Sequence, residues 1–178
     1  MSLHLVETKI SKENESKERF EQRVVSLKEQ LEKQEASLVE VQVSKAYDVA
    51  FFIVEAESIE QALPLFAEED FTVTLEKEVR LIGESIEEVK RQNEQVNYIV
   101  EWNLPAHLTM DQYLARKEKN SAKYSEVPEV AFARTYVCED MTKCLCFYDA
   151  PNQAAVEQAR EAVEAPIDQI TEVTRNQE

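Results

Sequence analysis

The sequence predicts an α+β protein in which one β-α-β-β-α-β unit occurs twice, and three observations lead to this class. Three pairs of blocks recur 94 residues apart: LVE at 5–7 and IVE at 99–101, FFIVEAES at 51–58 and LCFYDAPN at 145–152, and TLEKEV at 74–79 and DQITEV at 168–173. A fourth pair, EVQVSKAY at 40–47 and EVAFARTY at 129–136, recurs 89 residues apart. Helical and strand periodicities follow the same order in both halves. The 178-residue chain is also long enough for one large domain or two small ones.

The first half supplies each element of the unit in order. LHLVETKI predicts a strand, and residues 15–37 follow as a helix. Apolar side chains recur there on one helical face, at Phe20, Val24, Leu27 and Leu31. VEVQVSKAY and VAFFIVEA are strands joined by a turn near Asp48. Ser58 is the expected N-cap of a helix through IEQALPLFAEE, because Gln61 lies three residues on, and FTVTLEKEVRLI ends the unit as a long strand.

The second half repeats this order from NYIVEWNLP to DQITEVT. The order β-α-β-β-α-β is the split unit of a ferredoxin-like fold. We therefore expect ferredoxin-like domains at 1–83 and 96–178, joined by a charged helical linker over 84–95 that follows the only glycine, Gly83. Each sheet carries helices on one face only, so we expect tandem repeats packed sheet to sheet as a pseudo-dimer, like a dimeric α+β barrel.

The charge balance argues against two classes of partner. The chain has 36 Asp and Glu against 20 Lys and Arg, a net charge of -16, and shows no basic face for nucleic acid or an anionic membrane. Apolar runs such as VAFFIV are far shorter than the roughly 20 residues of a membrane span. The first residues lack an apolar signal core, and three cysteines without such a signal predict reduced thiols. We expect a cytoplasmic protein that is a monomer, as a pseudo-dimer, or a weak homo-oligomer.

Alternation along the predicted hairpin of the second half suggests a ligand cavity. If the hairpin is centred near Asp140, the face turned toward the sister unit carries Arg134, Tyr136, Cys138, Cys144, Cys146 and Tyr148. Leu145 and Phe147 then face the helices. The candidate ligand-binding residues are Arg134, Tyr136, Cys146, Tyr148 and Trp102.

An anionic or aromatic small molecule is the expected occupant of such a cavity. A buried guanidinium needs an acidic partner, and tyrosines offer stacking area and hydroxyl groups. The alternative is a filled interface, in which Arg134 pairs with a carboxylate such as Glu7 or Glu101 and the cysteines act as small apolar side chains. The sequence leaves both open.

The three cysteines also raise the question of a metal or a nucleophile. Structural zinc takes four ligands, usually from CxxC turns and often with histidine, and neither pattern occurs. A soft metal held by Cys138 and Cys144 is the remaining metal candidate. No histidine lies near the cysteines in sequence, and one glycine cannot form a Gly-rich phosphate loop, so no catalytic residue is assigned. The thiols are expected to be free.

The stretch RTYVCEDMTKCLCFYDAPNQAAV, followed by APIDQITEV, resembles an uncharacterised family of short ferredoxin-like domains that includes a bacterial nickel-binding protein. The resemblance covers about residues 96–174. The positions of its pattern are occupied by Tyr136, Val137, Asp140, Lys143, Cys146, Tyr148, Ala150, Pro151, Pro166, Asp168, Ile170, Glu172 and Val173. Phe132, Gln158 and Glu164 replace a tryptophan, a helix histidine and a glycine of the family. The resemblance implies the fold, and it makes a divalent metal such as nickel the candidate cofactor without supplying a ligand or an activity.

Three functions follow from these observations. The first is a non-enzymatic cytoplasmic protein that binds a small ligand or a metal ion. The second is an enzyme that uses the inter-sheet cavity of an α+β barrel. The third is a structural or partner-binding protein recruited through its acidic helical faces.

Overall fold

The computed structural model describes residues 1–11, 16–91 and 96–174, and their contacts form two compact units. Residues up to Val79 and helix α3 (Ile86–Arg91) make up the first unit. Residues 80–85 and the described chain from Val96 onward make up the second unit. The predicted linker is therefore shared: α3 contacts β2 of the first unit, and Lys90 Nζ lies 3.3 Å from Glu55 Oε1. Residues 92–95 of that linker lie outside the described residues, and the exact domain limits stay a prediction.

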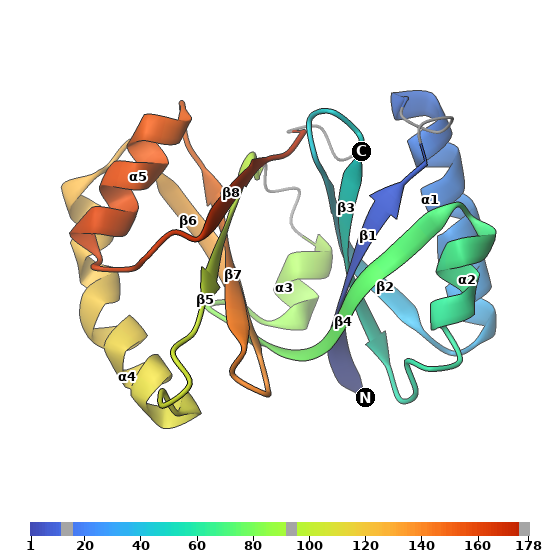
Figure 1. The fold of residues 1–178 in the computed structure, drawn as a ribbon, viewed down its shortest axis with the longest axis horizontal. Helices are drawn as coiled ribbons and strands as arrows, with labels where there is room; N and C mark the ends of the chain where they lie inside the picture. Colours follow the sequence, from blue (N-terminus) through green and yellow to red (C-terminus); the bar gives the residue numbers. More distant parts are fainter. Residues whose placement is uncertain (12–15, 92–95, 175–178) are drawn as a thin grey trace. The chain divides into compact units, whose positions relative to one another are not determined.

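The first unit has the predicted element order. It consists of β1 (Ser2–Ile10), α1 (Lys17–Lys33), β2 (Ser37–Val43), β3 (Val49–Ala56), α2 (Leu63–Glu68) and β4 (Phe71–Ile82), although the end of β4 after Val79 belongs to the second unit. The strands follow the order β2-β3-β1-β4, and each neighbouring pair is antiparallel. Helices α1 and α2 cover one face of this sheet (Figure 1). The ferredoxin-like unit predicted for the first half is confirmed.

Apolar side chains between the sheet and the helices hold the first unit together. Helix α1 begins where the Ser16 side chain accepts a hydrogen bond from the Arg19 amide, and it buries Phe20, Leu27 and Leu31. Phe52 of β3 meets Phe66 of α2 and Phe71 of β4 in edge contacts, at ring-centroid distances of 5.1 and 5.0 Å. The helix, the hairpin and the last strand thus share one core.

The predicted capping of α2 by Ser58 is wrong. The helix begins at Leu63, has Pro64 in its first turn and receives no side-chain cap. Proline lacks an amide hydrogen and has a fixed φ, so it suits a first turn better than a helix interior. The Ser58 hydroxyl instead donates to Glu60, at 3.0 Å.

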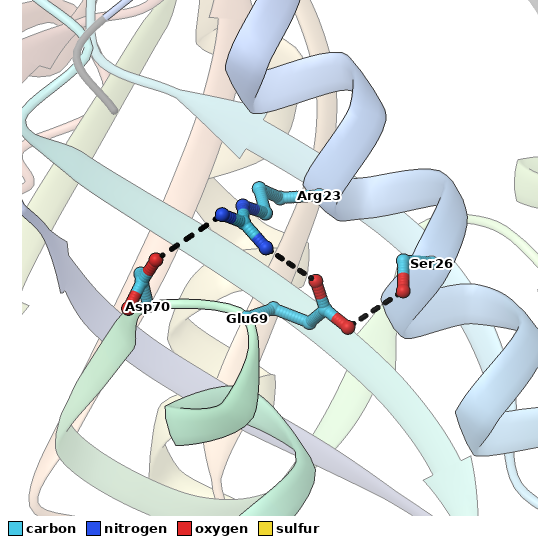
Figure 2. Close-up of polar contacts among 4 residues, drawn as sticks. All are labelled: Arg23, Ser26, Glu69 and Asp70. Carbon is cyan, nitrogen blue, oxygen red and sulfur yellow. Dashed lines mark hydrogen bonds and ion pairs between the residues drawn. The ribbon is translucent and has the colours of Figure 1, made fainter. Parts of the chain in front are cut away.

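A set of polar contacts ties α1 to the end of α2 (Figure 2). Arg23 lies 3.5 Å from Glu69 and 3.4 Å from Asp70, and the Ser26 hydroxyl donates to Glu69 at 2.6 Å. The Arg23 side chain is 39% exposed. Exposed ion pairs of this kind contribute about 1 kcal/mol or less, so these contacts position the two helices more than they stabilise the unit.

The second unit repeats the architecture. It consists of β5 (Tyr98–Asn103), α4 (Met110–Ser121), the 3-10 helix η2 (Ala122–Glu126), β6 (Ala131–Cys138), β7 (Lys143–Asp149), α5 (Gln153–Ala162) and β8 (Gln169–Glu172). The strand order is β6-β7-β5-β8, with antiparallel neighbours, and α4 and α5 cover one face of the sheet (Figure 1). The prediction of two tandem ferredoxin-like repeats is therefore confirmed. Their sheet-to-sheet packing concerns the arrangement of the units and stays a prediction.

Side-chain caps and one amide fix the ends of these elements. Thr109 and Gln112 form a capping box at α4, and Asn152 caps α5. The buried amide of Asn97 bonds both backbone groups of Ala150: Nδ2 donates to the carbonyl at 2.7 Å, and Oδ1 accepts from the amide at 2.9 Å. Asn97 thereby joins the residue before β5 to the residue after β7.

The two units correspond at a single spacing of 94 residues. Strands β2 and β6 begin at Ser37 and Ala131, and β3 and β7 begin at Val49 and Lys143. The match at 89 residues, which aligned Tyr47 with Tyr136, does not correspond to the fold. Tyr47 lies in the turn after β2 with a φ of 59°, whereas Tyr136 lies within β6.

Among the described helices, none has the length and apolar character that crossing a membrane requires.

Candidate functional site

The strand register of the β6–β7 hairpin corrects the predicted faces. Val137 pairs with Cys144 and Tyr136 with Leu145, so the turn is centred between residues 140 and 141, and a bulge lies between Phe132 and Arg134. A shift of one residue moves every side chain of a strand to the opposite face. The set on the helix side is Val137, Cys144, Cys146 and Tyr148. The prediction that Cys146 and Tyr148 share a face with Arg134 and Tyr136 is therefore wrong.

Arg134 is held by a buried ion pair within the second unit. Its Nη1 lies 3.2 Å from Glu84 Oε1, and the two side chains are only 5% and 9% exposed. Its guanidinium also lies 5.6 Å from the ring centroid of Phe147, which contacts Tyr136. Arg134 thus forms an ion pair, as the filled-interface alternative expected, but with Glu84 in place of Glu7 or Glu101. Glu101 pairs instead with Lys143, at 2.8 Å. A ligand-binding role for Arg134 and Tyr136 stays a prediction.

The cysteines do not form the predicted metal pair. All three are free, as expected. Cys138 lies next to Val137 on β6 and points to the opposite side of the sheet from Cys144, so the two thiols cannot bind one ion. Burial raises the pKa of Cys138 above its ordinary value. Within residues 1–11, 16–91 and 96–174, no group of three His, Cys, Asp or Glu side chains is placed to hold a metal ion.

The helix side of the second sheet contains a cavity of about 30 Å³, which we call the α4–α5 pocket. It lies among α4, η2, α5 and the strands β5 and β7. Two predicted candidates, Trp102 and Cys146, line it. Three cationic side chains, Arg116, Lys117 and Arg160, line it as well, and none of the described residues of the lining is a carboxylate. The pocket is thus positively charged in a chain whose net charge is -16.

Arg160 of α5 is the unusual group of this pocket, because it is 2% exposed. Its Nη1 donates to the Tyr148 hydroxyl at 3.0 Å, and its Nη2 donates to the Pro166 carbonyl at 2.6 Å. The Tyr148 hydroxyl lies 2.5 Å from the Tyr124 hydroxyl. The Arg160 Nε is buried without a hydrogen-bond partner, and no described carboxylate forms an ion pair with this guanidinium. The acceptors of its described hydrogen bonds are both neutral oxygens, and the Cys146 thiol is the acidic group whose charge acts on it.

The positive charge of Arg160 affects the acidity of the Cys146 thiol, which lines the same pocket. Its Sγ accepts a hydrogen bond from the Thr135 hydroxyl at 3.2 Å. The hydrogen bond from Cys144 and the positive charges of Lys117 and Arg160 lower the pKa of Cys146 well below its ordinary value, against the effect of burial. Burial raises the pKa of Tyr148, so its phenol stays neutral. The pocket therefore favours negative charge.

Sequence reasoning named Trp102 and Cys146 as ligand-binding residues but expected them in a cavity between the sheets, and it missed the helix residues of this pocket. A signal for Arg160 was present: it lies four residues after Val156, within the buried stripe that α5 forms with Ala155 and Ala159. An arginine in an apolar stripe predicts a buried charge. Tyr124 carried no such signal, because η2 is a short irregular helix whose place depends on packing.

Comparisons with known proteins support the class defined by this fold. A family model described as nickel responsive protein SCO4226-like matches residues 98–173, which confirms the predicted resemblance of the second half. The structure of SCO4226 from Streptomyces coelicolor A3(2) is 18% identical over 46% of this chain and 99% of its own, with a TM-score of 0.39. A comparison with curated proteins found no significant relative.

Two other solved structures are similar along nearly the whole chain. One is named putative chlorite dismutase TA0507; it is 10% identical and covers 98% of this chain and 95% of its own, with a TM-score of 0.61. The other is named a putative monooxygenase, from Lactobacillus acidophilus NCFM. It is 10% identical and covers 98% of this chain and 94% of its own, with a TM-score of 0.58. At such low identity the likeness shows the fold alone.

Proposed function

We propose that the protein is a non-enzymatic cytoplasmic protein that binds a small ligand in the α4–α5 pocket of its second unit. The observation that carries this proposal is the Arg160 guanidinium, which is buried beside the pocket without a carboxylate partner. A buried charge that lacks a full set of partners is costly, and a bound ligand is one way to offset that cost. Cys146 is 2% exposed, which leaves its thiol little access to a substrate and favours binding over nucleophilic catalysis.

The single tryptophan gives this proposal a direct test. Trp102 lines the pocket and is 7% exposed, so its fluorescence reports on this site. Small polar molecules added to the wild-type protein are expected to change Trp102 emission in a saturable way. Lys117→Met should weaken the response, whereas Lys119→Met, an exposed change on the same helix outside the pocket lining, should not.

Native mass spectrometry of the freshly purified protein provides an independent measurement. An added mass that is lost in Lys117→Met and retained in Lys119→Met would support the site. A protein that carries no added mass, and whose Trp102 emission responds to no small molecule, would refute the proposal.

A divalent metal is the second candidate ligand, favoured by the nickel responsive family model that matches residues 98–173. Because the described residues offer no group of three likely ligands, we expect any nickel binding to be weak and to contribute nothing to folding. Chelation should leave the melting temperature unchanged, as measured by circular dichroism. A large fall on chelation, reversed by nickel and not by magnesium, would instead indicate a structural nickel site.

A further inference from the structure

We infer that the α4–α5 pocket binds a small monovalent anion, with the Arg160 guanidinium as its main partner. This inference rests on the proposed function and names the chemical class of the ligand. Arg116, Lys117 and Arg160 line the pocket, and no carboxylate in the described part of the chain does. Such a lining attracts negative charge in a protein that is otherwise strongly acidic.

The hydrogen bonds of Arg160 indicate where an anion would bind. A guanidinium has five N–H donors, and buried donors in proteins nearly always have an acceptor. Nη1 and Nη2 are bonded to Tyr148 and Pro166, but the buried Nε is unpartnered. Tyr124 also lines the pocket, and when the Tyr148 hydroxyl donates to the Tyr124 hydroxyl, the hydrogen of Tyr124 is left to donate to a ligand. These groups suit an acceptor that carries negative charge.

The size of the pocket limits the ligand. About 30 Å³ holds roughly two water-sized groups, which fits an ion of one to three heavy atoms, such as chloride or formate. A phosphate ester or an aromatic acid is larger than this volume. The other two cations are already partly engaged, since Arg116 lies 5.3 Å from the Trp102 ring centroid and Lys117 lies 4.5 Å from that of Phe132. Arg160, whose buried Nε has no acceptor, is thus the cation of this lining best placed to bind a single negative charge.

Chloride is the probe for the test, and the broadening of its NMR line reports binding to the wild-type protein directly. Arg160→Met is expected to weaken chloride binding by about tenfold or more, because it removes a charged donor. Arg23→Met, which alters a half-exposed arginine of the first unit, should leave binding unchanged. Circular dichroism and Trp102 emission establish that each variant is folded.

A second measurement decides the question if Arg160→Met fails to fold. The wild-type protein should melt at a higher temperature in chloride than in gluconate of equal ionic strength, because gluconate is too large for the pocket. Lys117→Met should reduce this difference, and Lys119→Met should not. Equal melting temperatures in the two salts, or equal line broadening by wild type and Arg160→Met, would overturn the inference.

The outcomes also separate the inference from the proposed function. A neutral or cationic molecule that changes Trp102 emission, while chloride and formate do not bind, would refute the anion and leave the small-ligand function standing. Absence of any ligand would refute both.

Discussion

Replacing Arg134 with Met should lower the free energy of unfolding by about 3–5 kcal/mol. The change removes the ion pair with Glu84, whose side chain is 9% exposed, and leaves that buried carboxylate without the Arg134 charge. Removing one member of a buried pair is far more damaging than removing both. Chemical denaturation followed by Trp102 fluorescence measures the loss, since Arg134, Glu84 and Trp102 all belong to the second unit.

Two further variants isolate the effect of burial. Arg80→Met breaks a similar pair with Glu139, but those side chains are 45% and 35% exposed, so the expected cost is about 1 kcal/mol or less. The double variant Arg134→Met with Glu84→Leu removes both charges and should recover most of the loss. If Arg134→Met costs no more than Arg80→Met, the buried pair does not stabilise the unit and Arg134 becomes available for a ligand again.

Phe52→Ala should destabilise the first unit by about 3–5 kcal/mol. The Phe52 ring is fully buried and contacts the rings of both Phe66 and Phe71, so its loss leaves a cavity where α2, β3 and β4 meet. Urea denaturation followed by circular dichroism is the suitable measurement, because the only tryptophan lies in the second unit.

The controls for this change vary volume and burial separately. Phe52→Leu keeps most of the apolar volume and should cost less than half as much. Val25→Ala removes an apolar side chain that is 58% exposed and should change stability by about 0.5 kcal/mol or less. Equal effects of Phe52→Ala and Val25→Ala would show that the three-ring cluster does not form the core of this unit.

Strands with strong patterns could be predicted to the residue. VAFFIVEA and FTVTLEKEVRLI correspond to β3 (Val49–Ala56) and β4 (Phe71–Ile82), because branched and aromatic residues favour strands and turn residues flank them. The helix expected to start at Ser58 was longer than α2. A serine followed by a glutamine three residues on predicts a cap only where the backbone between them is helical.

The face of a strand proved harder to predict than the strand itself. Alternation shows which side chains of one strand go together, but the pairing of β6 with β7 depends on the turn between them. Met141 in that turn has a φ of 63°, and β6 contains a bulge after Phe132. Each feature shifts by one residue the pairing of β6 with β7, and so changes which of their side chains share a face. Neither leaves a glycine or another clear mark in the sequence. Arg134 and Tyr136 lie on the predicted face, away from the helices, whereas Cys146 and Tyr148 were assigned to the wrong side.

The double hydrogen bond of Asn97 to Ala150 has a consequence for the chemistry of the pocket. The side-chain amide acts as one additional rung of the β5–β7 ladder, with donor and acceptor arranged like those of a peptide group. Sliding β7 by one residue would break both buried bonds together and would turn Cys146 and Tyr148 away from α5. The side-chain amide of Asn97 thus helps to hold β7 in the register in which Cys146 and Tyr148 face Arg160.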